Sequence, residues 1–117
     1  MAALHDREGI TMNRTIAILA LPLIAAACAK SPDAIAPVSM GNAFAGVTCQ
    51  QASADLAAER QNLAALEDAQ RGAVAGDAIG VFLIGVPMSS LSGGDKAGDI
   101  ATSKGKVLAL ETRLRGC

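Results

Sequence analysis

Apolar residues recur at helical spacing in the stretch TCQQASADLAAERQNLAALEDAQRGAVAG, residues 48–76. They keep a seven-residue rhythm built from steps of three and four, in which the step between Leu56 and Leu63 falls on Glu59. The positions are Ala52, Leu56, Leu63, Leu66 and Ala73. Thr48 with Gln51 three residues later is a capping-box pattern, in which the threonine oxygen accepts a backbone N–H at the start of a helix. Alanine, leucine, glutamine and glutamate, which are strong helix formers, dominate the rest of the stretch. The pattern predicts a helix that begins directly after Thr48.

A second helical pattern occupies GDIATSKGKVLALETRLRGC, residues 98–117. Its narrow stripe, again spaced by threes and fours, comprises Ile100, Ser103, Val107, Leu110, Leu114 and Cys117. Arg113 and Arg115 near its end suit the helix dipole, and Gly116 is placed to end the helix. Two helices with narrow apolar stripes predict an all-α fold, an antiparallel two-helix hairpin over residues 48–117 with an apolar, glycine-rich connection.

The connection, RGAVAGDAIGVFLIGVPMSSLSGGD, is the least polar part of the hairpin. Its glycines 72, 76 and 80 have the small-xxx-small spacing that lets membrane helices approach closely, and the segment resembles the glycine zippers of envelope lipoproteins. Residues 78–91 carry no charge, and Pro87 should end or kink the first helix. An exposed apolar tip of this kind is typical of an interaction site, expected to comprise Gly72, Gly76, Gly80, Val81, Phe82, Leu83, Ile84 and Val86.

Two alternatives remain open at this tip. The apolar residues fold over and pack on one another, or they contact a membrane or a partner protein. Asp77, inside the glycine pattern, is expected to be a solvated residue on the helix surface; the alternative is a buried acid with a role of its own.

An apolar stretch also precedes the hairpin, TIAILALPLIAAACAK at residues 15–30. Its charge-free part, residues 16–29, is shorter than the about 20 residues that span a bilayer. Arg14 before it and Ala25–Ala27 at its end are the basic start and small residues of a secretory signal. Because Asp6 and Glu8 do not suit such a signal, we expect Met12 to be the true start, residues 1–11 to be a spurious extension, and residues 12–27 to be the signal peptide.

The small residues followed directly by Cys28 resemble the lipobox of bacterial lipoproteins, although Ala25 stands where that box usually has leucine. The resemblance implies that Cys28 is lipidated and becomes the N-terminus. Ala29 carries no acid that would retain the protein at the inner membrane, so the resemblance implies an outer-membrane anchor facing the periplasm. The alternative is ordinary cleavage, which leaves a soluble periplasmic protein.

Between the anchor and the hairpin, residues 28–47 contain prolines and glycines that interrupt regular structure. They are predicted to form a flexible tether. The alternative is an extended strap, in which Ile35, Val38, Met40 and Phe44 pack onto the hairpin.

Composition and charge exclude several classes of function. The formal net charge of the chain is −1, and it stays −1 for residues 28–117 because Arg7 and Arg14 balance Asp6 and Glu8. No clustered basic surface for nucleic acid is expected. The one histidine, His5, precedes the signal peptide, so the mature chain has no imidazole for acid–base work, nucleophile activation or metal binding. We therefore predict no enzyme, no catalytic residues, no metal and no cofactor.

Cys49 and Cys117 are expected to form a disulfide, because secretion exposes them to an oxidising compartment. Such a bridge would close the open end of the hairpin and set its register. In that register Ala52 faces Leu114, Leu56 faces Leu110, Leu63 faces Ser103 and Leu66 faces Ile100.

The whole layout resembles a group of short, uncharacterised bacterial lipoproteins. The shared features are Cys28, the SPDAIAP segment at residues 31–37, Cys49, the apolar residues 72–91, the GGD of residues 93–95, and the final Gly116-Cys117. The resemblance implies location and architecture but no activity. Two functions are compatible with it: a lipid-anchored structural or protein-interaction module, whose tip meets an envelope protein or a second copy, and a membrane-active or oligomerising element.

Overall fold

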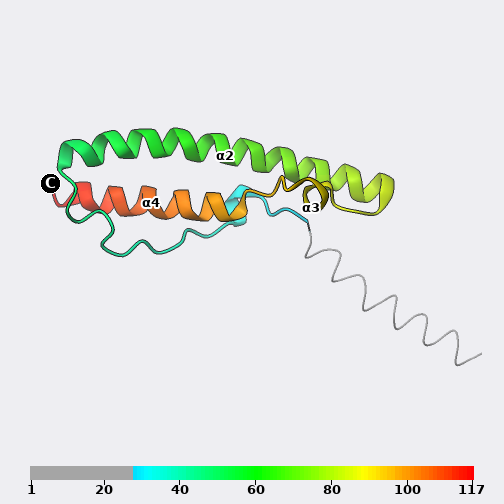
Figure 1. Ribbon diagram of the computed structural model, residues 1–117, viewed down its shortest axis with the longest axis horizontal. Helices are drawn as coiled ribbons and strands as arrows, with labels where there is room; N and C mark the ends of the chain where they lie inside the picture. Colours follow the sequence, from blue (N-terminus) through cyan, green and yellow to red (C-terminus); the bar gives the residue numbers. More distant parts are fainter. Residues whose placement is uncertain (1–27) are drawn as a thin grey trace, which may run out of the picture.

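The computed structural model of the protein describes residues 28–117, which form helices joined by irregular segments. In order these are the short 3-10 helix η1 (Pro32–Ala34), the long helix α2 (Cys49–Ile84), the short helix α3 (Met88–Ser92) and the helix α4 (Ala97–Arg115). Helices α2 and α4 lie antiparallel, side by side, so the predicted two-helix hairpin is confirmed (Figure 1). The expected signal peptide and the expected extension before it lie outside the described residues. Among residues 28–117, no helix combines the length and apolar character needed to cross a membrane.

The ends of α2 follow from its local sequence. Thr48 is its N-cap, and the side-chain oxygen of Thr48 accepts a hydrogen bond of 3.2 Å from the backbone N–H of Gln51. At the other end Gly85 adopts a left-handed conformation with φ of 74°, which glycine enters without steric cost. Pro87 stands just before α3, so the residue that stops α2 is Gly85 rather than the proline.

The seam between α2 and α4 joins the two predicted stripes. Ala52 and Leu56 of α2 are buried against Leu110 of α4, and partly buried residues complete the cluster: Phe44, Val47, Val107 and Leu114. The polar residue in the stripe of α2, Glu59, also contacts the polar residue in the stripe of α4, Ser103. The hydroxyl of Ser103 donates to the carboxylate of Glu59 over 2.6 Å, and Lys106 lies 3.6 Å from the same carboxylate. The polar residue Glu59 in the apolar stripe of α2 therefore has polar partners, Ser103 and Lys106, on α4.

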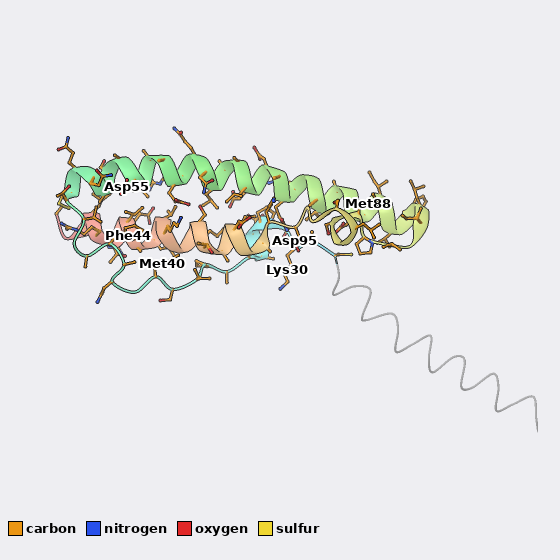
Figure 2. The ribbon with its side chains drawn as sticks, in the orientation of Figure 1. Lys30, Met40, Phe44, Asp55, Met88 and Asp95 are labelled. Atoms are coloured by element: carbon orange, nitrogen blue, oxygen red, sulfur yellow. A yellow bond between two sulfur atoms is a disulfide. The ribbon has the colours of Figure 1, made fainter. Side chains whose placement is uncertain are left out.

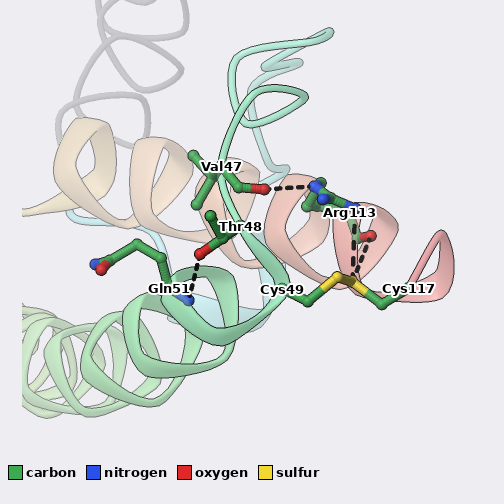
Figure 3. Close-up of a disulfide and its surroundings, with 6 residues drawn as sticks. All are labelled: Val47, Thr48, Cys49, Gln51, Arg113 and Cys117. Atoms are coloured by element: carbon green, nitrogen blue, oxygen red, sulfur yellow. Dashed lines mark hydrogen bonds between the residues drawn. A yellow bond between two sulfur atoms is a disulfide. The ribbon is translucent and has the colours of Figure 1, made fainter.

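A disulfide joins Cys49 and Cys117 at the open end of the hairpin, as predicted, with their Cα atoms 6.0 Å apart (Figure 3). The guanidinium of Arg113 donates to the carbonyl oxygen of Val47 over 2.7 Å and fixes the chain where it enters α2. The disulfide, the Thr48 N-cap and this hydrogen bond together hold the start of α2 and the end of α4 in place.

Residues 29–47, here called the strap, run back along α4 instead of standing away from it (Figures 1 and 2). The backbone N–H of Val38 donates to the carbonyl oxygen of Ala101 over 2.9 Å, and the ammonium of Lys104 donates to the carbonyl oxygen of Pro32 over 2.6 Å. A Cβ atom at Gly105 would overlap the carbonyl oxygen of Val38, so glycine makes room for this approach. Residues 29–47 are therefore packed on α4, as the strap alternative expects, and do not form the flexible tether that was predicted.

Candidate functional site

The exposed apolar surface of the protein is concentrated at the turn between α2 and α3. Among residues 28–117, most of the large apolar side chains that are exposed lie here, and we call them the apolar cap: Ile79, Phe82, Leu83, Ile84, Val86, Met88 and Leu91. Phe82 is 86% exposed and Leu83 is 70% exposed. Helix α3 folds back onto α2, yet it leaves these side chains uncovered. The connection therefore folds over, as the first alternative expects, but its large apolar side chains stay exposed instead of packing on one another.

Beneath the cap lies a buried carboxylate. Asp77 of α2 is 1% exposed, so the expectation that it is a solvated surface residue is wrong. Its oxygens accept three hydrogen bonds: 2.6 Å from the backbone N–H of Ala29, 2.6 Å from the hydroxyl of Ser89 and 2.5 Å from the backbone N–H of Ser89. Asp77 thus ties the start of the strap and the start of α3 to α2.

These hydrogen bonds also set the charge state of the site. The bond from the Ala29 N–H, followed by those from Ser89, holds the pKa of Asp77 below its ordinary value, and burial opposes this effect only in part. Asp77 is therefore ionised at neutral pH. One sequence signal could have revealed its role: it is the only charged residue between Arg71 and Asp95.

A second buried polar side chain of α2, that of Gln70, lies seven residues before Asp77, toward the disulfide end of the helix. The amide nitrogen of Gln70 donates to the carbonyl oxygen of Lys30 over 2.8 Å and to the carboxylate of Asp95 over 3.0 Å. Its oxygen accepts from the backbone N–H of Lys96 over 2.6 Å. Figure 2 shows Lys30 and Asp95 beside one another near the start of α4. Gln70 and Asp77 together fasten the first residues of the strap to α2.

The three glycines of the predicted zipper have different surroundings. A Cβ atom at Gly80 would come within 2.6 Å of the Met88 side chain and 2.7 Å of the carbonyl oxygen of Val86, so glycine is required where α3 returns. At Gly72 and Gly76 such an atom would meet nothing within 4 Å. Of these three glycines, only Gly80 allows a close approach between segments of the hairpin.

The predicted site residues separate into two groups. Cys28 is half-buried and directly precedes Ala29, so it lies in the same half of the molecule as the cap. Phe82, Leu83, Ile84 and Val86 belong to the cap, whereas Val81 is half-buried. Cys49 and Cys117 lie at the opposite end of α2. The structure therefore brings the expected lipidation residue toward the apolar tip and places the disulfide far from both.

Outside the apolar cap and the Asp77 site, we searched residues 28–117 for pockets and for groups of metal-binding side chains. A shallow hollow between the strap and α4 is lined by Gly41, Phe44, Ala109 and Arg113, among others. Within residues 28–117, no group of three or more histidine, cysteine or acidic side chains could hold a metal ion. No family model matches the chain, and neither a curated protein nor a solved structure matches it.

Proposed function

We propose that the chain is a lipoprotein of the bacterial cell envelope, anchored to the outer membrane through acyl chains on Cys28, and that it acts as a structural or protein-interaction module. The signal-like segment before Cys28 supports the anchor. The observation that carries the proposal is the attachment of Ala29, the next residue, to the buried Asp77 through a 2.6 Å hydrogen bond. Because the strap is packed, the anchor connects to a folded domain without a loose spacer.

This attachment supports an orientation in which the tip half of the hairpin faces the membrane. Asp77 lies 28 residues along α2 from Cys49, which corresponds to about 40 Å of helix at about 1.5 Å per residue. A lipid on Cys28 would therefore hold the tip half at the membrane and extend the disulfide-closed end up to that distance into the periplasm. Two or three acyl chains give firm attachment, since each buried methylene contributes about 0.8 kcal/mol.

The experiment that tests this function compares the natural chain with Cys28→Ala after expression in a bacterial host. We expect the natural chain to be acylated by mass spectrometry and to enter the detergent phase on phase partition, and Cys28→Ala to stay in the aqueous phase. The matched control replaces the other two cysteines, Cys49→Ala with Cys117→Ala, and should keep the detergent behaviour. An unmodified Cys28 in the natural chain would contradict the proposal.

A membrane-active role for the tip is the second candidate, and the exposure of the cap in the half of the molecule that contains Cys28 favours it.

A further inference from the structure

We propose that the apolar cap enters the same bilayer leaflet as the acyl chains on Cys28, so that the protein is held at the membrane at two points. This inference rests on the proposed lipid anchor and adds a second, non-covalent site of lipid contact. The occupant is a lipid surface. Its evidence is the position of the cap relative to the anchor residue and to the charges of the chain.

The first argument is one of position. The Ala29 N–H is hydrogen-bonded to Asp77, and Phe82 and Ile84 lie five and seven residues farther along the same helix. At about 1.5 Å per residue, the cap extends roughly 7 to 10 Å beyond the level of Asp77. Apolar side chains of interfacial segments enter the boundary between headgroups and acyl chains by about 5–10 Å. With the lipidated cysteine at the headgroups, α2 directed into the membrane would place the cap at this depth.

The second argument is one of charge. From residue 72 to residue 94 the only charged side chain is Asp77, which is buried and accepts hydrogen bonds on both oxygens. The nearest other charged residues are Lys30, which directly follows Ala29, and Arg71, Asp95 and Lys96. All four lie near Gln70, whose position on α2 is about 10 Å from that of Asp77 on the side away from the cap. The part of the cap beyond Asp77 therefore contains no charged side chain that would have to leave water, and the buried carboxylate of Asp77 lies at the level of the anchor with its oxygens hydrogen-bonded.

The third argument concerns the alternatives. A second copy of the chain, or another protein, would have to reach the cap at the level where the acyl chains of Cys28 enter the bilayer. Lipid already surrounds that level. A protein partner would need to displace it, whereas lipid covers the cap without any further component.

The test uses a single tryptophan, because the chain contains no tryptophan and no tyrosine. Phe82→Trp is introduced into the full chain, which is expressed, purified and reconstituted into phosphatidylcholine–phosphatidylglycerol vesicles with brominated acyl chains. Leu108→Trp is the matched control, since Leu108 is an exposed apolar residue of α4 outside the cap. Leu91→Trp is a second cap probe in case the first variant folds poorly.

We expect the fluorescence of the cap tryptophan to shift to the blue and to be quenched by the brominated chains, and the Leu108→Trp fluorescence to remain water-like and unquenched. A cap tryptophan that is water-like in vesicles would overturn the proposal. A blue-shifted but unquenched tryptophan would overturn it too, because that result indicates contact with protein.

Mass spectrometry of the same samples reads the anchor separately. An acylated chain with an unquenched cap refutes the cap proposal and leaves the anchor intact. A chain without acyl groups refutes the anchor; quenching of its cap tryptophan by added vesicles then still supports lipid contact, and absence of quenching rejects it.

Discussion

In the half of the hairpin that contains the disulfide, α2 buries Ala52 and Leu56 against Leu110, and charged side chains such as Arg60 and Glu111 pair on the surface. In the half that contains the cap, the distribution is reversed. The buried side chains there include Gln70, Asp77 and Ser89, while the exposed ones include Phe82 and Leu83. The first half is arranged as a small protein in water would be, and the second is not.

The two halves of the hairpin are stabilised by different kinds of interaction. The disulfide-closed half is held by burial of apolar surface, which water drives, and by a covalent bridge. The cap half is held by hydrogen bonds to a buried carboxylate and a buried amide, both fully partnered. An exposed apolar surface over a satisfied polar interior costs little if the surface does not face water. The comparison therefore supports an environment for the cap that differs from that of the rest of the hairpin.

The largest expected effect is the loss of the disulfide. Cys117→Ser opens a loop whose ends are separated by 68 positions, and the loop-entropy relation assigns about 4 kcal/mol to such a bridge. We expect a sharp fall in melting temperature, measured by circular dichroism, and a similar fall when the natural chain is reduced. A melting temperature that reduction leaves unchanged would show that the closed half does not depend on its bridge.

A matched pair of leucines tests the two halves directly. Leu110→Ala should reduce the free energy of unfolding by about 2–5 kcal/mol, because Leu110 is fully buried in the seam. Leu83→Ala should change it by less than about 0.5 kcal/mol in water, because Leu83 is exposed. Urea unfolding of both variants without membranes measures the difference. Equal losses would mean that the cap is packed in solution and that the two halves of the hairpin do not differ in this respect.

Acid should loosen the cap half through Asp77. Since the pKa of this carboxyl is lowered in the folded protein, its stabilising effect is present above its ordinary value and is lost as the pH falls through the folded value. As the pH falls below the ordinary aspartate value of about 3.9 and through the lower folded value, hydrogen exchange at the amides of Ala29 and Ser89 should become faster than at pH 7, after correction for the intrinsic rate. Asp77→Asn should show fast exchange at these amides at neutral pH as well as in acid.

The readout must be local, because the closed half also contains an acid-sensitive carboxylate. Partial burial would raise the pKa of Glu59, but hydrogen bonds from Ser103 and Asn62 and the charge of Lys106 outweigh it and lower that pKa. Exchange at amides near Glu59 measures that separate acid response, which should be the same in the natural chain and in Asp77→Asn. If Asp77→Asn keeps the acid response of the natural chain at Ala29 and Ser89, the carboxylate does not hold the strap.

Sequence reasoning succeeds where a pattern is local or periodic. Three features were predictable because spacing and redox chemistry determine them. They are the apolar stripes through Leu56 and Leu110, the helix N-cap at Thr48 and the pairing of Cys49 with Cys117. The strap and the site around Asp77 were not predicted as the preferred outcome. Both depend on contacts between residues far apart in sequence, such as Ala29 with Asp77 and Val38 with Gly105, for which a single sequence contains no periodic signal.

Effects smaller than the loss of the disulfide distinguish two glycines of the same pattern. Gly72→Ala should raise the free energy of unfolding by up to about 1 kcal/mol, because alanine favours a helix and its Cβ meets nothing within 4 Å. Gly80→Ala should lower it by roughly 1–3 kcal/mol despite the same gain, since the new Cβ would press on the Met88 side chain and on the carbonyl oxygen of Val86. Urea unfolding compares the two variants under identical conditions, with exchange at the Ser89 amide reporting whether α3 has moved. If both variants are stabilised alike, α3 does not pack on Gly80, and the cap loses the support that keeps its apolar side chains on the outside.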